Sequence, residues 1–187
     1  MRNAILAALL AAGLALPARV HAQDSGPGLF SRLHYGVTAG GMIPVGQQGK
    51  DLRRGGHFGA EAYGETALGV QFGTEGSYTA STDPLKTRIA QVGVFTRLSP
   101  SPEDYRLYVQ FGLGGYAVSY HPESPSLPRP SSAFRPGGSF AIGAEFAQLS
   151  ALSIGGSACY HGILLQRHHA VAYSTLRLHV TYQHLAL

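Results

Sequence analysis

Beyond residue 23, the chain alternates apolar and polar residues one by one. In residues 105–113 (YRLYVQFGL) every second position, from Tyr105 to Leu113, is apolar or aromatic, and the positions between hold Arg106, Tyr108, Gln110 and a glycine. Successive side chains of a β-strand point to opposite faces, so a period of two predicts a strand with one apolar and one polar face. The same pattern recurs at about 33–43, 57–63, 68–78, 86–98, 138–146, 152–161 and 175–183. The sequence therefore predicts eight β-strands.

The chemistry of the two faces decides where the apolar one points. Glycine supplies 25 of 187 residues, and only 13% of residues are charged, about half the usual ~25%. The polar face is rich in glycine and serine, which suits the tight interior of a small barrel better than a water-exposed surface. We therefore predict an all-β, eight-stranded, antiparallel up-and-down transmembrane barrel, with apolar residues toward lipid. A soluble barrel is the alternative.

The N-terminus predicts export. Arg2 precedes the apolar run AILAALLAAGLAL at residues 4–16, and Val20-His21-Ala22 places small residues at −3 and −1 of a cleavage site. This is the pattern of a secretory signal peptide. We predict a cleaved signal peptide at 1–22, a periplasmic tail at 23–32 and an outer-membrane barrel at 33–187. Loss of Arg2 and Arg19 would lower the net charge of +4 to +2.

The connections between strands predict an orientation. Outer-membrane barrels have short periplasmic turns and longer external loops. Short turns are expected at 65–67, 99–104 and 148–150, and external loops at 44–55, 79–85, 121–136 and 163–170. The two kinds alternate as an up-and-down barrel requires.

Three stretches resemble the outer-membrane β-barrel domain family, the eight-stranded OmpA/OmpX-like and opacity-type proteins. They are Arg106–Tyr116 (RLYVQFGLGGY), Ser139–Tyr160 (SFAIGAEFAQLSALSIGGSACY) and Leu176–Tyr182 (LRLHVTY). The resemblance implies insertion into a bacterial outer membrane by the barrel-assembly machinery, guided by a C-terminal aromatic residue. Here His184 stands where that aromatic is expected, so the insertion signal is atypical. Trp is absent, which leaves an interfacial girdle to tyrosines at 35, 78, 105, 173 and 182.

Six charged side chains are predicted to face the barrel interior. An unpaired buried ion costs several kcal/mol, so acids and bases inside a narrow barrel are expected to pair. Such a set either plugs the lumen or gates a polar channel; the small interior of eight strands favours the plug. The predicted lumen polar network is Glu61, Glu75, Arg97, Arg106, Glu145 and Arg177.

The sequence holds little further chemistry. His57, His161 and His179 are predicted to face inward, but no set of ligands with fixed geometry is recognisable, so no metal site and no cofactor are predicted. Cys159 is the only cysteine, which excludes an intramolecular disulfide. A lipid A deacylase would need a His-x-Ser pair facing lipid; the nearest match, His161-Gly162-Ile163, lacks the serine. No enzyme is predicted, with a lipid A-modifying activity kept as an alternative.

Basic residues gather in the predicted external loops and outnumber the acids there, which are Asp51, Asp83 and Glu123. Either these bases are merely solvated, or they bind lipopolysaccharide phosphates, for which the arginine fork is well suited. The candidates are Lys50, Arg53, Arg54, Lys86, Arg88, Arg129, Arg135 and Arg167. Nucleic acid is not an expected partner, because the compartment is wrong and no aromatic reading face is present.

Together these features predict a monomeric integral outer-membrane barrel. Its expected role is structural or interactive, through membrane integrity, contact with outer-membrane lipid and lipopolysaccharide, or adhesion. A small-solute channel and a lipid A-modifying enzyme remain the alternatives.

Overall fold

The computed structural model describes residue 30 and residues 32–45, 54–66, 68–82, 86–99, 106–120, 131–164 and 170–185. The predicted signal peptide at 1–22 and most of the predicted tail lie outside these ranges. The strands are β1 (Arg32–Pro44), β2 (Gly55–Glu65), β3 (Val70–Ser81), β4 (Arg88–Leu98), β5 (Arg106–Tyr120), β6 (Ser131–Leu149), β7 (Leu152–Leu164) and β8 (Ala170–Leu185). None of the described residues belongs to a helix that is long and apolar enough to cross a membrane.

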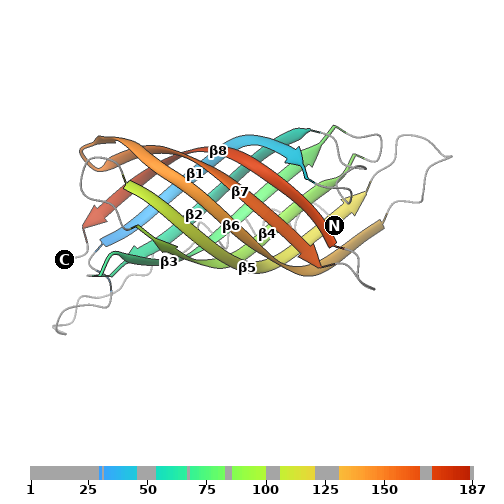
Figure 1. The fold of residues 1–187 in the computed structure, drawn as a ribbon, viewed down its shortest axis with the longest axis horizontal. Coiled ribbons are helices and arrows are strands. Elements are labelled where there is room, and N and C mark those ends of the chain that lie inside the picture. Colours follow the sequence, from blue (N-terminus) through green and yellow to red (C-terminus); the bar gives the residue numbers. More distant parts are fainter. Residues whose placement is uncertain are drawn as a thin grey trace, which may run out of the picture.

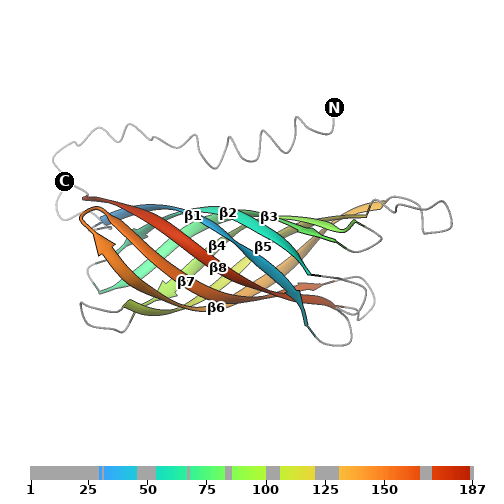
Figure 2. The ribbon, with the colours of Figure 1, turned by 90° about the horizontal axis from the view of Figure 1, so that it is seen from above.

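The eight strands form one closed antiparallel barrel, as predicted. Each strand pairs with its sequence neighbours, and β1 also pairs with β8 from Arg32↔Leu185 to Pro44↔Tyr173. Figure 1 shows the strands winding obliquely around the long axis, and Figure 2 shows the same closed wall from above. Closure pairs every strand on both sides, so the sheet has no free edge over its paired length.

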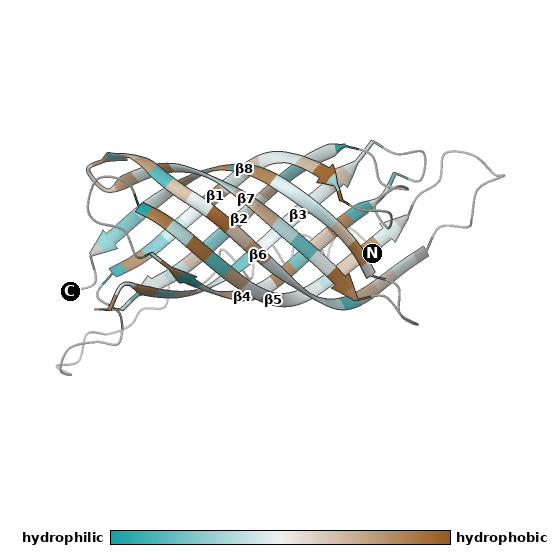
Figure 3. Cartoon of the chain, viewed as in Figure 1, coloured by the Kyte–Doolittle hydropathy of each residue, from teal (hydrophilic) through white to brown (hydrophobic). Residues whose placement is uncertain are grey.

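The two faces of the sheet are those predicted from the alternation. Leu107, Phe111, Leu176 and Leu178 are more than half exposed on the outside, whereas Arg177 is almost fully buried inside. Figure 3 shows hydrophobic and hydrophilic positions alternating along single strands. The outer surface is therefore apolar around the ring, and the polar side chains gather in the lumen.

The barrel has two distinguishable ends. The turn end carries the connections 66–69, 99–105 and 150–151, and both the start of β1 and the end of β8 lie there (Figure 1). The loop end carries the connections 45–54, 82–87, 121–130 and 165–169. The predicted alternation of short and long is only partly right. The two longest connections are at the loop end, but 99–105 exceeds both 82–87 and 165–169.

The tightest turns use backbone conformations with positive φ. Gly69 has φ +76° in the β2–β3 turn, which costs a glycine nothing. Ser150 has φ +56° in the β6–β7 turn, the left-handed region that is uncommon for a residue with a side chain.

Between Glu145 and Ala147 the β6–β7 register shifts by one residue, a β-bulge at Phe146. The bulge moves Ala147 to the outer face, opposite Ile154.

The predicted external loop at 121–136 is wrong at its C-terminal side, because β6 begins at Ser131. Residues 131–136 pair with β5 only, since pairing with β7 starts at Gly137. At Pro136, β6 therefore has a partner strand on one side only, the edge position to which proline in sheets is largely confined. The ring of Phe134 lies over Gly115 of β5, where an added Cβ would collide with it. This aromatic cover of a glycine supports a strand that a proline would otherwise disfavour.

The β1–β8 closure depends on a glycine. A Cβ added at Gly40 would collide with the backbone carbonyl of Leu176, whereas at neighbouring Gly41 the nearest atom is the Gly55 carbonyl oxygen at 3.9 Å. We predict that Gly40→Ala forces β1 and β8 apart and destabilises the barrel by about 3 kcal/mol, the upper end of overpacking costs. Gly41→Ala is the matched control and should fold like the parent. Folded fraction is measured by the shift in gel migration between boiled and unboiled samples. Equal folding of both variants would contradict the role of Gly40.

Candidate functional site

A polar cluster in the lumen is organised by Arg97 of β4, whose side chain is 2% exposed. Its Nη2 donates to Glu61 Oε2 at 2.9 Å. Its Nε and Nη2 both donate to Gln110 Oε1, at 3.1 and 2.9 Å. The Glu61 carboxylate compensates the buried cation, and Gln110 satisfies further donors, as burial of a guanidinium requires.

Three aromatic rings enclose the same guanidinium. Its central carbon lies 4.3 Å from the ring centroid of Tyr108, 4.6 Å from Tyr63 and 5.2 Å from Phe95. Such cation–π contacts strengthen when the cation is desolvated. Tyr63 also meets Phe95 edge-on, with centroids 5.9 Å apart. The rings come from β2, β4 and β5, so this cage lies in the lumen near the turn end.

A second ion pair lies on the loop-end side of the first. Arg177 of β8 reaches Glu75 of β3 at 3.7 Å and donates from Nε to Ser157 Oγ at 3.2 Å. Gln91 Nε2 donates to Glu75 Oε1 at 2.6 Å. Glu61 and Glu75 are direct cross-strand partners on the inner face. Like charges directly opposite each other are destabilising, so this register is tolerated because each acid has its own arginine.

The third pair lies at the turn end and differs from the prediction. Arg106 Nη1 reaches Glu65 Oε2 at 3.8 Å, and His34 Nε2 contacts the same oxygen at 3.2 Å. Glu145 is the register partner of Arg106 on β6, but within the described part of the chain no ion pair involves it. Sequence analysis placed Glu65 in a turn. Its inward direction follows from continuing the alternation of Glu61 and Tyr63 by two residues.

The lumen near the loop end holds an apolar cluster, which corrects the expectation of a polar interior throughout. A cluster of buried side chains, here called the septum, comes from β1, β4, β5, β7 and β8. In an eight-stranded ring β1 and β5 lie on opposite walls, so these side chains meet across the lumen. The septum consists of Met42, Ile89, Tyr116, Val118, Ile163 and Tyr173. Tyr173, expected in the interfacial girdle, is fully buried because it has the inward parity of Thr175 and Arg177.

Two histidines adjoin the septum. His161 stacks on Tyr173 with ring centroids 4.5 Å apart, and its Nε2 lies 3.3 Å from Thr175 Oγ1. His57 Nδ1 lies 2.9 Å from Thr79 Oγ1. Cys159 is buried and unbridged. Among the residues the structure describes, no group of three or more His, Cys, Asp or Glu side chains is placed to hold a metal ion.

The predicted phosphate-binding bases separate into three groups. Arg54, Lys86 and Arg88 are exposed at the loop end of β2 and β4. Arg135 lies within β6 rather than in a loop, with inward parity, and its Nε is buried without a hydrogen-bond partner. The remaining candidates fall outside the described residues; they are Lys50, Arg53, Arg129 and Arg167.

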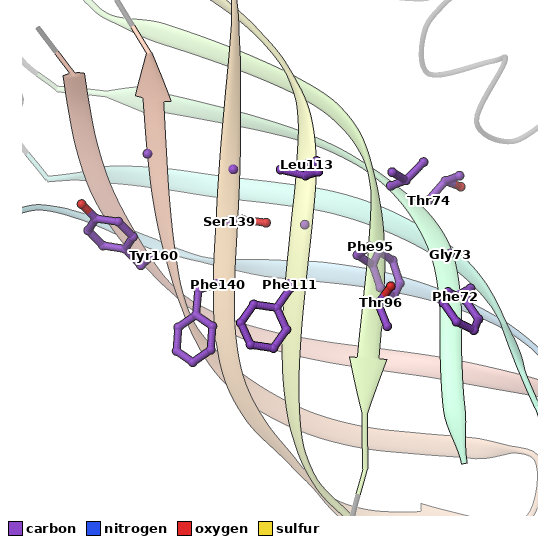
Figure 4. A pocket seen from close by; sticks show the side chains of 14 residues that line it. Phe72, Gly73, Thr74, Phe95, Thr96, Phe111, Leu113, Ser139, Phe140 and Tyr160 are labelled. Carbon is purple, nitrogen blue, oxygen red and sulfur yellow. The ribbon is translucent and has the colours of Figure 1, made fainter. Parts of the chain in front are cut away.

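The outer wall carries a groove of about 910 Å³ across β3 to β7. In Figure 4, Phe111 and Phe140 lie side by side on adjacent strands, with Phe72 and Tyr160 on the flanks. Gly138 and Gly162 are cross-strand partners in its lining, where side chains are missing. Sequence analysis found the outward aromatics but not this hollow, which depends on the register that places two glycines together.

Comparison with known proteins supports the fold. No protein-family model matches the sequence, and a search of curated proteins finds no match. Among solved structures, the chain resembles Neisserial surface protein A, with a TM-score of 0.67 and 12% identity over 83% of this chain and 99% of that one. It also resembles the N-terminal β-barrel domain of Pseudomonas aeruginosa OprF, with a TM-score of 0.55 and 10% identity over 83% and 98%.

A major outer membrane protein from Thermus thermophilus is a further match, with a TM-score of 0.53 and 12% identity over 81% of this chain and 99% of that one. At such identities the likeness concerns the fold alone. The chain has the fold of eight-stranded outer-membrane barrels, which confirms that part of the predicted resemblance. The opacity-type part stays a prediction.

The cage around Arg97 generates a stability prediction. Arg97→Met leaves Glu61 buried without its cation, which should cost about 3–5 kcal/mol. Adding Glu61→Gln to Arg97→Met should recover part of this loss, because the uncompensated charge is gone. Arg106→Met, whose parent side chain is 24% exposed, should cost less than about 1 kcal/mol. Urea unfolding in lipid vesicles measures all three. Equal losses for Arg97→Met and Arg106→Met would contradict the dominance of the central pair.

Proposed function

We propose that this chain is an integral outer-membrane barrel that acts through its outer surface and external loops rather than through its lumen. The observation that carries the proposal is the distribution of polarity across the wall. Large apolar side chains are exposed outside, and charged ones are buried inside. Lipid around the barrel accounts for the exposed apolar side chains. A closed barrel can stand in lipid because its wall satisfies the backbone polar groups. Its fold is that of known outer-membrane barrels.

The proposed orientation places the turn end in the periplasm. Both the start of β1 and the end of β8 lie there, and the two longest connections lie at the loop end. External loops are the longer ones in barrels of this kind. Insertion by the barrel-assembly machinery after cleavage of residues 1–22 belongs to the same proposal.

The lumen is proposed to be closed at two levels. The septum joins opposite walls at the loop end, and the Arg97 cage fills the lumen nearer the turn end. The interior of eight strands is just wide enough for side chains to fill. The buried histidines His34, His57, His161 and His179 point into this interior, away from the surface that a lipid substrate would contact. A structural or surface-interaction role fits these features best, with lipopolysaccharide contact the favoured form.

Membrane integration is tested with cells that express the chain. The protein should stay with the membrane fraction in alkaline carbonate and in high salt, and detergent should release it. Unboiled and boiled samples should migrate differently on a gel, because a folded barrel resists the detergent until heated. Release by carbonate alone would overturn the proposal.

Lumen closure is tested in planar bilayers. The purified barrel should give no steady conductance, because two packed layers block the path. Combining Tyr116→Ala and Tyr173→Ala with Arg97→Ala truncates both layers and should create conductance, which shows that the assay can detect an open lumen. Steady openings from the parent protein would favour the small-solute channel instead.

A further inference from the structure

Three basic residues, Arg54, Lys86 and Arg88, are exposed at the loop end, and Arg88 has the outward parity of β4. Lys86 and Arg88 are exposed on either side of Thr87, which is 1% exposed, and buried Ile89 continues the alternation. Arg54 is exposed two residues before exposed Gly56. We infer that these bases hold the phosphates of a phosphorylated, acylated glycolipid with the chemistry of lipid A, whose acyl chains follow the wall below. This inference rests on the proposed outer-membrane function and names the partner.

The register brings the bases close together. Arg88 of β4 is the cross-strand partner of Ala80 on β3, and Gly55 of β2 is the partner of Ser81. The backbone oxygen of Arg54 accepts a hydrogen bond from the N–H of Thr82 at 3.1 Å. Arg54 and Arg88 thus flank β3 on its two sides. With strands about 4.8 Å apart and an offset of two residues along β3, their backbones are about 12 Å apart, which lets both side chains reach one phosphorylated headgroup.

No described carboxylate shares this outer face. Glu61 and Glu75 are buried in the lumen, and Glu65 and Glu145 have inward parity at the turn end. Among the described residues at the loop end, the outer face therefore carries bases and no acid. A phosphate that approaches Arg54 and Arg88 from the lipid side therefore meets no described carboxylate.

A path for acyl chains, here called the lane, runs from the bases along the outer face of β3, from Ala80 to Thr74. On its outer face Ala80 is followed by Tyr78, Gly76 and Thr74 at two-residue steps, so Thr74 lies about 20 Å along the strand from Ala80. The cross-strand partners of Gly76 are Ala60 and Val92, so small side chains flank much of this lane. Tyr78 lies at the top of the lane, where its hydroxyl suits the headgroup level and its ring the chains.

The lane opens into the outer groove of Figure 4. Thr74 belongs to both, and the groove continues past Val94 and Leu113 to the side-chain-free pair Gly138 and Gly162. Its volume of about 910 Å³ and its aromatic lining are suited to apolar chains. The bases complement an anionic headgroup. The apolar lane and groove complement a lipid with several acyl chains. The two ends of the site thus match the two ends of one molecule.

The test measures binding of bis-phosphorylated, hexa-acyl lipid A to the purified barrel in detergent by native mass spectrometry. Arg54→Gln with Arg88→Gln removes two charge-assisted contacts and should raise Kd at least tenfold. The charge-matched control is Arg32→Gln with Arg106→Gln at the turn end, which should change Kd less than twofold. Equal weakening by both pairs would show attraction by net charge alone and overturn the site.

The acyl lane has its own variants. At Gly76 the nearest atom to an added Cβ is the Gln91 carbonyl oxygen at 3.9 Å, so Gly76→Leu fills the lane without a backbone collision. Gly156 of β7 is the control on the opposite wall; the neighbours of its added Cβ are 3.5 Å away or more. Gly76→Leu should weaken lipid A binding at least threefold and Gly156→Leu should not. No difference between them would overturn the acyl part of the site.

Two further comparisons distinguish lipid A from other lipids that carry phosphate, and failure of this inference from failure of the proposed function. Monophosphorylated lipid A should bind more weakly than the bis-phosphorylated form, and phosphatidylglycerol more weakly still; tight binding of phosphatidylglycerol would overturn the assignment to a lipid A-type glycolipid. Every variant is first checked for heat-dependent migration. Loss of the predicted differences in a folded barrel contradicts this inference alone, whereas a parent protein that does not integrate contradicts the proposed function.

Discussion

Closure of eight strands into one ring is the constraint from which the other features follow. In a closed sheet every strand has two neighbours, so the backbone satisfies its own hydrogen bonds and needs no water along the wall. Closure with so few strands also leaves a narrow interior, and each inward side chain must fit against the opposite wall. The Gly40 contact with the Leu176 carbonyl shows how closely the first and last strands approach. Glycine is abundant because many inward positions face either backbone or a large neighbouring side chain.

The same narrowness explains why the lumen is layered. A buried arginine needs its charge compensated. Glu61 compensates Arg97, Gln110 accepts hydrogen bonds from its Nε and Nη2, and three aromatic rings enclose the guanidinium, whose Nη1 is buried without a described partner. Glu75 and Arg177 repeat the arrangement one step toward the loop end. Beyond them six apolar and aromatic side chains form the septum, with His57, His161 and Arg135 as polar inward neighbours. The acids of the described residues are thus confined to the middle and the turn end.

The outer wall carries the features through which the protein is proposed to act. Apolar side chains cover it around the ring, and the glycine pair Gly138 and Gly162 lies in the lining of a groove. The exposed bases Arg54, Lys86 and Arg88 lie at the loop end. The proposed surface role rests on this difference between the two ends of the outer wall.

The sequence by itself determined the strands and their faces, because a period of two follows from local backbone geometry. Strand number, inward Glu61, Arg97 and Arg177, and outward Phe111 were all predictable in this way. Only the tertiary structure decided which inward charges pair. Arg106 reaches Glu65 rather than Glu145, because pairing depends on how side chains cross the lumen. Register decided the septum, the β6 extension past Pro136 and the groove between Gly138 and Gly162. Alternation says which face a residue takes, whereas distance across a closed ring depends on all eight strands together.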